Sequence, residues 1–216
     1  MTEKYFYGIE ELINRYPNLE VCKEDIKSAF NLLVETYENS GMLFIAGNGG
    51  SCADSQHITG ELMKGFKSSR KLSEEQIQTL KSIDSLLGEE IGCRLQRGLP
   101  CISLTDHQAL NTAFINDVQD GGLYTYAQQI NVLAKHGDVF LGISTSGNSK
   151  NVLYAAIVAK AKGAKVIGLT GQDGGELSKV ADVVIKAPVK ETFMVQEYHL
   201  PIYHCLCLML ENRFFN

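Results

Sequence analysis

The chain has 216 residues, a length that suits one well-buried α/β domain better than two full domains. Its 25 acidic and 20 basic residues leave a formal net charge of −5, which argues against a nucleic-acid-binding protein that depends on a broad basic surface. The six cysteines lack CxxC spacing, the first residues lack the basic-then-apolar order of a secretory signal, and no charge-free apolar stretch of about 18 residues occurs. These features predict a cytoplasmic protein with reduced thiols, no nucleic-acid partner and no membrane span.

The first predicted element is a helix over residues 19–40. Its apolar side chains, from Val21 to Tyr37, recur at roughly helical spacing, and Gly41 follows as a C-terminal stop. We therefore expect residues 1–40 to form an N-terminal helical arm that buries one face.

Short apolar runs that lead into turns recur along the rest of the chain. They cover residues 42–46, 101–104, 139–143, 166–169 and 183–185. Helical patterns lie between them, the clearest over residues 151–162, and a long C-terminal helix follows the last run. Strands that alternate with helices predict a three-layer α/β/α fold around a parallel five-stranded sheet, flavodoxin- or Rossmann-like, with ligands at the carboxyl ends of the strands.

Residues 73–97 interrupt this alternation, because apolar side chains recur there at steps of three and four. Ser73, with Gln76 three residues later, predicts a capping box at the start of one inserted amphipathic helix. We find no internal repeat and no low-complexity linker. The sequence therefore predicts a single domain over residues 1–216 that carries a helical insertion over residues 67–98.

The glycine-rich turn at residues 47–51 (Gly-Asn-Gly-Gly-Ser) follows the first predicted strand. Glycines allow close backbone approach, and the free N–H groups of a following helix attract anions, so Asn48, Gly49, Gly50 and Ser51 are candidates for an anion cradle. The turn is neither a dinucleotide fingerprint nor a P-loop, because Cys52 stands where GxGxxG needs its third glycine and no Lys-Ser/Thr pair follows. Alone, it is equally consistent with a tight turn that binds nothing.

A second turn, residues 144–149 (Ser-Thr-Ser-Gly-Asn-Ser), follows the third strand and is rich in hydroxyl groups. A serine N-cap would explain one hydroxyl but not those of Ser144, Thr145, Ser146 and Ser149 together. Hydroxyl and N–H groups hold a phosphate with little help from Lys or Arg. Two such turns at strand ends favour a phosphate site.

These turns and several further motifs resemble those of the sugar isomerase (SIS) family, and within it the bacterial phosphoheptose isomerases, over nearly the whole chain. The matching segments are residues 47–51, 53–57 with Glu61, Asn116 with Asp117, 141–149, 169–175 and 195–199. The resemblance implies the SIS fold. It also implies that the hydroxyls of both turns bind the substrate phosphate, and that Asn116, Asp117 and Gln196 contact substrate.

Two pairs of polar side chains occur at helical spacing. His57 and Glu61 are four residues apart, so both lie on one face of the helix after the first turn. Gln196 and His204 are eight apart, about two helical turns. Taken alone, each pair is more simply explained as a satisfied polar pair, or as residues that cap or plug a buried helix.

Interconversion of a ketose and an aldose phosphate gives these pairs a second explanation. The reaction moves a proton between adjacent carbons through an enediol, which requires a base and an acid, and Glu61 and His204 suit these roles. The resemblance implies the same assignment, and it implies a zinc ion held by His57, Glu61, Gln196 and His204. Zinc would stabilise the enediolate as a Lewis acid, although an amide is an unusual zinc ligand.

The chain departs from the family pattern at several positions. The family's arginine after the catalytic glutamate is Gly65 here, which leaves Lys64 or Lys67 as substitutes, and an aspartate of some members is Phe193. Pro201 lies between Gln196 and His204 and removes a helical hydrogen bond. His199 is expected to be a core or interface residue.

The hypothesis is an isomerase that converts sedoheptulose 7-phosphate to D-glycero-D-manno-heptose 7-phosphate, for the heptose of surface polysaccharide. The alternative is a non-catalytic SIS module that binds a phosphosugar or a protein. A relative of that kind, which associates with the replication initiator DnaA, lacks the residues that match Glu61 and His204. The resemblance further implies a homotetramer with sites between subunits, and the predicted helix over residues 192–214, apolar nearly all round, is consistent with an oligomer core.

Overall fold

A computed structural model describes residues 7–216. Its centre is a five-stranded sheet in the order β2-β1-β3-β4-β5, and every pair of neighbours is parallel. The strands are β1 Leu43–Gly47, β2 Cys101–Ser103, β3 Val139–Ser144, β4 Lys165–Thr170 and β5 Val183–Lys186. This is the flavodoxin-like strand order, in which ligands bind beyond the carboxyl ends of the strands near β1 and β3. The predicted sheet and its five strands are confirmed.

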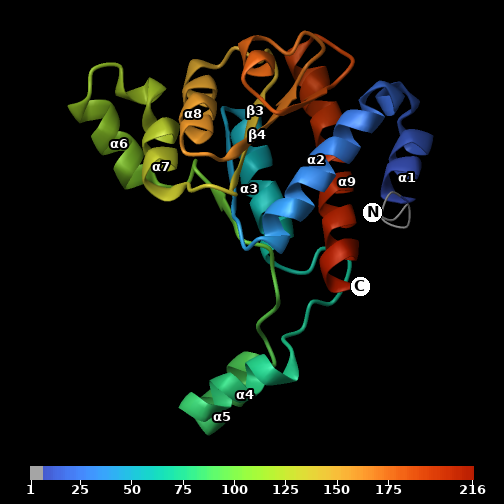
Figure 1. The fold of residues 1–216 in the computed structure, drawn as a ribbon, viewed down its shortest axis with the longest axis vertical. Helices are drawn as coiled ribbons and strands as arrows, with labels where there is room; N and C mark the ends of the chain where they lie inside the picture. The colour runs from blue at the N-terminus through green and yellow to red at the C-terminus, as the bar shows by residue number, and fades with distance from the viewer. Residues whose placement is uncertain (1–6) are drawn as a thin grey trace.

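Helices cover both faces of the sheet, as the three-layer prediction requires (Figure 1). Side chains of β1 alternate between the faces: Leu43 and Ile45 pack in one core, and Phe44 and Ala46 in the other. The first core contains residues of α1 Tyr7–Arg15, α2 Lys23–Glu38, α3 Gly50–Met63 and α9 Thr192–Phe215, and the second contains residues of α7 Thr125–Leu133 and α8 Lys150–Ala161. The remaining segments include α6 Gln108–Asp117 and the 3₁₀ helices Pro17–Cys22, Gly121–Leu123 and Glu176–Lys179.

The N-terminal region is helical but divided. Pro17 begins the short 3₁₀ helix, and α2 begins only at Lys23, so the single helix expected over residues 19–40 has two parts. Gly41 follows as expected, because a Cβ there would lie 2.5 Å from the carbonyl oxygen of Gly137. The arm also contains α1, whose Ile9 and Leu12 are buried. Residues 1–6 of the predicted arm lie outside the described part.

The insertion consists of two helices, α4 Glu74–Ile83 and α5 Ser85–Gly92, instead of one. The predicted capping box of Ser73 and Gln76 is present. The break falls at Asp84, whose backbone is extended and whose carboxylate accepts hydrogen bonds from the N–H groups of Leu86 and Leu87. The chain then folds back into a helical hairpin that stands clear of the body (Figure 1).

Helices α3 and α9 lie side by side and run in the same direction. Near their starts, the side-chain amide of Gln196 lies against Gly50, and two turns later the rings of His57 and His204 have centroids 5.0 Å apart. The α-helix α9 continues through Pro201. Within the described part of the chain, no helix combines the length and apolar character needed to cross a membrane.

Candidate active site

The first predicted turn forms the start of α3 at the carboxyl end of β1. Gly49 is the N-cap with φ of 56°, a conformation that favours glycine, and a Cβ at Gly50 would lie 2.6 Å from the amide nitrogen of Gln196. The Asn48 side chain exchanges two hydrogen bonds, 2.8 and 2.9 Å long, with the amide of Asn151 on α8. This fixes Asn48 beside the N-terminus of α3, whose helix dipole favours an anion.

The second predicted turn lies beside the first, at the end of β3. The hydroxyl of Ser144 donates to that of Ser149 at 3.0 Å, and Ser149 is the N-cap of α8. Gly147 has φ of 70° and its Cα lies so close to Gly174 that no Cβ fits there. The loop after β4 supports this turn, because the N–H of Gly171 donates to the carbonyl of Thr145 at 2.9 Å. Two helix N-termini, those of α3 and α8, therefore converge at one edge of the sheet.

A cavity of about 300 Å³ lies between the two turns, and we call it the cradle. Its lining includes eight of the predicted substrate-binding residues: Asn48, Gly49, Gly50, Ser51, Ser144, Thr145, Ser149 and Gln196. Among the described residues no Lys or Arg lines the cradle, and its polar side chains carry hydroxyl or amide groups, so its affinity for an anion would come from dipoles and hydrogen bonds.

Three predicted residues are not part of the cradle. Ser146 is exposed, and its hydroxyl accepts from the N–H of Asn148 within the turn. Asn116 and Asp117 are exposed at the end of α6, where the amide of Asn116 donates to the carboxylate of Asp117 at 2.9 Å. Helix α6 lies on the side of the molecule away from α9 (Figure 1).

The candidate base Glu61 and the candidate acid His204 both contact His57, about two to three helical turns along α3 from the cradle. The Nε2 atom of His57 is 3.4 Å from Oε1 of Glu61, and Nζ of Lys64 is 3.3 Å from Oε2. The Glu61 side chain is only 12% exposed, which keeps its carboxylate in a site from which much of the water is excluded. The ring of His204 contacts that of His57, so α9 delivers its imidazole to the side chains of α3.

The surroundings of His204 favour the neutral form of its imidazole. Burial lowers its pKa, and the neighbouring charge of His57 lowers it further, while Glu61 acts in the opposite direction. The imidazole is therefore mainly neutral at pH 7. Its Nε2 atom is buried and has no hydrogen-bond partner among residues 7–216. A buried ring nitrogen without a partner is costly, which is typical of a group that awaits a ligand.

Two residues that sequence reasoning missed complete this cluster. The hydroxyl of Tyr203 donates to Asp54 at 3.2 Å and lies 3.0 Å from Nδ1 of His57. Burial raises the pKa of the Asp54 carboxyl and also that of the Tyr203 hydroxyl. Asp54 is three residues before His57 on α3, so its helical spacing was a signal that could have revealed it. Tyr203 offered no comparable signal, because an aromatic residue in an apolar helix is usually core.

A buried ion pair shapes the loop after α3. Arg70 and Glu211 are 0% and 1% exposed, and Nε of Arg70 is 2.8 Å from Oε1 of Glu211. The guanidinium also donates to the carbonyls of Leu62 and Glu61 at the end of α3. Arg70 thereby fixes the backbone that carries the candidate base.

His199, expected in the core, is fully buried, and its Nε2–H donates to the carbonyl of Thr170. Burial lowers its pKa to about 4.

The predicted zinc ligands are only partly gathered. His57, Glu61 and His204 share one cluster, and the unpartnered Nε2 of His204 suits a metal ion, whereas Gln196 lies at the cradle. In the part of the chain that the structure describes, no three His, Cys, Asp or Glu side chains are arranged to hold a metal. The donor types fit zinc, but their arrangement is not a coordination shell.

The sheet order and the two helix N-termini at its carboxyl edge are those of a SIS-domain protein, and the model of the SIS domain matches residues 112–210. Curated relatives match almost the whole chain. The phosphoheptose isomerase of Geotalea daltonii is 40% identical over 88% of this chain and 84% of its own length, and that of Helicobacter pylori strain P12 is 36% identical over 99% and 96%. The chain therefore belongs to the phosphoheptose isomerase family, which confirms both the resemblance and the prediction of an enzyme.

The fold agrees with this assignment. The solved structure of phosphoheptose isomerase GmhA from Neisseria gonorrhoeae superposes with a TM-score of 0.72 and 28% sequence identity. The match covers 97% of this chain and 98% of that chain. The arm and the sheet therefore have counterparts in a known isomerase.

Proposed function

We propose that this isomerase interconverts sedoheptulose 7-phosphate and D-glycero-D-manno-heptose 7-phosphate. The observation that carries the proposal is the placement of an anion cradle and an acid–base pair along the same two parallel helices, α3 and α9. Membership of the phosphoheptose isomerase family supports it.

The spacing of the two groups suits a long phosphosugar. From Ser51 at the cradle to His57 and Glu61, α3 rises by roughly 9 and 15 Å, at about 1.5 Å per residue. An extended chain advances about 1.2 Å per bond, so the eight or so bonds between the phosphorus and C1 of an open heptose 7-phosphate span roughly 10 Å. A triose or tetrose phosphate is too short to place its phosphate in the cradle and its reacting carbons at His57.

In the proposed mechanism the phosphate binds in the cradle and the open-chain ketose extends along α3. Glu61 removes a proton from C1, and His204 donates a proton to the oxygen on C2, which gives the neutral enediol. Glu61 then returns its proton to C2 while His204 takes the proton of the C1 hydroxyl, and the aldose results. Each group ends in its starting protonation state, so the cycle needs no further proton donor.

We also propose zinc as the metal of this site, held by His57, Glu61 and His204. Bound zinc would supply Lewis-acid stabilisation of the enediolate oxygens. The cluster of donors and the unpartnered Nε2 of His204 support this proposal. Gln196 would have to turn from the cradle to complete the predicted set of four.

Assembly as a homotetramer with sites at subunit interfaces is a further part of the proposal. Asn116 and Asp117 are exposed at the end of α6, where they are available to the site of another subunit. Helix α6 has no buried residue in this chain, and α9 exposes Phe193 and Leu200. Exposed apolar side chains of this size are typical of a surface that another subunit covers.

The free cysteines bear on the compartment in which the enzyme works. All six cysteines are free, which supports a reducing compartment and hence the cytoplasm. We place the reaction in the synthesis of heptose for surface polysaccharide. One domain over residues 1–216, with its arm and its insertion, carries the activity.

The test is an isomerase assay with sedoheptulose 7-phosphate, with and without added zinc. We expect turnover of the heptulose and little turnover of shorter ketose phosphates. Loss of deuterium exchange at the substrate carbon in Glu61→Gln, with binding retained, would support the base assignment. The matched control is Glu90→Gln, an exposed glutamate on the hairpin. Absence of turnover on every ketose phosphate under both conditions would leave the alternative, a SIS module that binds without catalysis.

A further inference from the structure

The hairpin of α4 and α5 exposes its apolar side chains. Helices of 10 and 8 residues gain little stability alone and depend on burial of an apolar face. No large apolar side chain of residues 73–95 is buried, and Ile83 and Leu86, at the turn, are 83% and 82% exposed. We call the exposed set the apolar face of the hairpin: Ile83, Leu86, Leu87, Ile91 and Leu95. Residues 7–216 leave this face uncovered.

Two glycines explain why these side chains do not pack between the two helices. A Cβ at Gly88 would lie 2.4 Å from the carbonyl carbon of Leu80, and one at Gly92 would lie 3.1 Å from a side chain of α4. The helices therefore approach each other too closely at Gly88 to admit a large side chain. Leu87 and Ile91 directly precede these glycines, so they lie at the edge of the contact. The hairpin thus keeps its shape by close backbone contact and leaves its apolar face available to another surface.

A groove of about 340 Å³ on the body of the chain has a matching character. It lies where α6, α7 and α8 meet, and five of its seven lining residues are apolar, namely Phe114, Val118, Tyr124, Ala127 and Val158. In the described part of the chain, no charged side chain lines it. A cavity of roughly 150 Å³ takes up a benzene molecule, so this groove has room for two side chains of the size of leucine.

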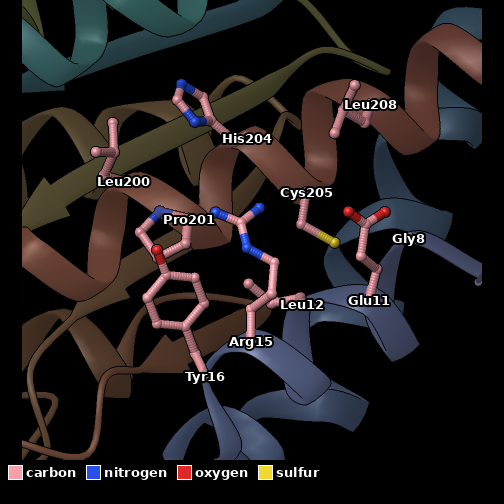
Figure 2. Close-up of a pocket in the computed structure, with 10 residues that line it drawn as sticks. All are labelled: Gly8, Glu11, Leu12, Arg15, Tyr16, Leu200, Pro201, His204, Cys205 and Leu208. Carbon is pink, nitrogen blue, oxygen red and sulfur yellow. The ribbon is translucent and has the colours of Figure 1, made fainter.

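Three other cavities outside the cradle do not suit an apolar occupant. The cavity between α1 and α9, of about 130 Å³, has the carboxylate of Glu11 and the guanidinium of Arg15 at its wall (Figure 2). Two cavities beside α2 are lined by Glu35 and Lys165. An apolar face that covered such groups would take their charges out of water without a partner. The groove at α6, α7 and α8 is therefore the surface that fits the hairpin.

A second copy of this chain is the occupant that the geometry and the area favour. Figure 1 shows the hairpin at the lower end of the long axis and α6 and α7 toward the other end, so the two surfaces of one chain do not meet. The apolar face presents on the order of 400 Å². One hairpin in one groove would bury about 800 Å² in total, which is no more than a crystal-packing contact. Exchange between two copies makes the contact twice and buries about 1,600 Å², the size of a specific interface.

We propose that two copies of the chain exchange hairpins, so that Leu86 and Leu87 of each copy occupy the groove of the other. Because the exchange is reciprocal, a two-fold axis closes the pair and no open surface remains to recruit further copies in a filament. The inference goes beyond the proposed isomerase function and does not depend on it, since the contact lies outside the cradle and the acid–base cluster.

Leu86→Glu and Val118→Glu test the two sides of the contact. The control is Val21→Glu, which places the same charge on an aliphatic residue that is 72% exposed on the 3₁₀ helix Pro17–Cys22. We expect either test variant to halve the mass of the assembly and to raise the dissociation constant at least tenfold, because a carboxylate would be buried in an apolar contact. Sedimentation velocity over a series of chain concentrations measures both, and circular dichroism checks the fold. A monomeric unaltered chain, or test variants that assemble as the control does, would overturn the proposal.

Cross-linking identifies the occupant of the groove. Leu86→Cys and Val118→Cys are introduced into separate chains, each with Cys93→Ser to remove the exposed thiol of the hairpin, and the two chains are co-expressed and treated with a short bis-maleimide. We expect a link between positions 86 and 118, which in this mixture joins two copies. A link between position 86 of one copy and position 86 of another would mean that hairpins pair with each other. No link beyond that of Cys93→Ser alone would mean that a different molecule covers the hairpin. Either of these results would contradict the exchange.

Discussion

The side-chain amide of Gln196 packs directly on the backbone of Gly50, where the first turns of α9 and α3 meet. A Cβ at Gly50 would lie 2.6 Å from the amide nitrogen and 2.9 Å from its carbon. Gly50 is helical and needs no unusual backbone conformation, so its role is to leave room for another side chain. The contact connects the floor of the cradle to the helix that carries His204.

Replacement of Gly50 by alanine should therefore damage the site and not the fold. The added methyl group displaces Gln196 from the cradle, and we expect activity to fall at least tenfold and phosphate binding to weaken, with an intact far-ultraviolet spectrum. The matched control is Gly60→Ala on the same helix, where a Cβ would have no neighbour within 4 Å. Alanine at such a position stabilises a helix by about 0.5–1 kcal/mol. Full activity of Gly50→Ala would show that Gln196 is not needed at the cradle.

The sheet and both turns were predictable because their signals are local. Each strand is a short apolar run, and glycine or hydroxyl residues follow β1 and β3 directly, so hydrophobic period and turn composition suffice to place them. The carboxyl ends of parallel strands meet at one edge, which brings residues 47–51 together with residues 144–149 without any knowledge of long-range contacts.

Other parts of the structure depend on information that the sequence pattern does not contain. The apolar spacing of the insertion continues through Asp84, and only the competition between helix and side-chain capping at that residue divides it into a hairpin. The Arg70–Glu211 pair joins residues 141 positions apart, and no period reports such a pairing. Asn116 and Asp117 were assigned to the site by motif, but within one chain α6 holds them away from the cradle.

Tyr203→Phe tests the hydrogen bonds behind the acid–base cluster. The change removes the hydroxyl that joins Asp54 and His57 but keeps the ring, so packing is preserved. Asp54 then loses its hydrogen-bond donor, and the ring of His57 loses the contact that orients it, which we expect to lower kcat by about tenfold. Steady-state kinetics measure the effect. The control is Tyr154→Phe, because Tyr154 stacks on Tyr124 in another part of the molecule. Equal rates for the two variants would show that Tyr203 acts only through its ring.

The buried ion pair should make stability depend on pH. Burial alone would raise the pKa of Glu211, but hydrogen bonds from the N–H groups of Phe66 and Lys67, and then from Arg70, hold it below the usual value. A carboxyl whose pKa is lower in the folded state contributes stability above its unfolded pKa, about 4.3, and loses it as the pH falls toward the folded value. We therefore expect the free energy of unfolding, measured with urea, to fall below about pH 5.

Glu211→Gln should remove this contribution. The variant leaves the guanidinium of Arg70 buried without its counter-charge, which costs about 3–5 kcal/mol at pH 7, and the decline in stability below pH 5 should become shallower. Urea unfolding at pH 7 and pH 4 measures both effects. Glu176→Gln, which changes an exposed glutamate, should match the unaltered chain. A loss below 1 kcal/mol at pH 7 would indicate that water reaches the pair.

The helical hairpin should be removable without loss of the fold. No residue of α4 is buried, and α5 buries only Gly88 and Gly92. The base of the hairpin is closed by a hydrogen bond from the N–H of Arg97 to the carbonyl of Arg70. A short Gly-Ser linker in place of residues 74–92 preserves that base, and we expect a thermal midpoint within a few degrees of the original and retained isomerase activity.

Deletion of residues 1–16 is the contrasting variant. It removes Ile9 and Leu12 from the core, where burial of each such side chain stabilises the fold by about 1.5–3 kcal/mol, and its midpoint should fall by many degrees. Differential scanning calorimetry of both variants measures the contrast. If the hairpin deletion unfolds as readily as the arm deletion, the insertion belongs to the folding core, and its exposed Ile83 and Leu86 are covered in the native protein.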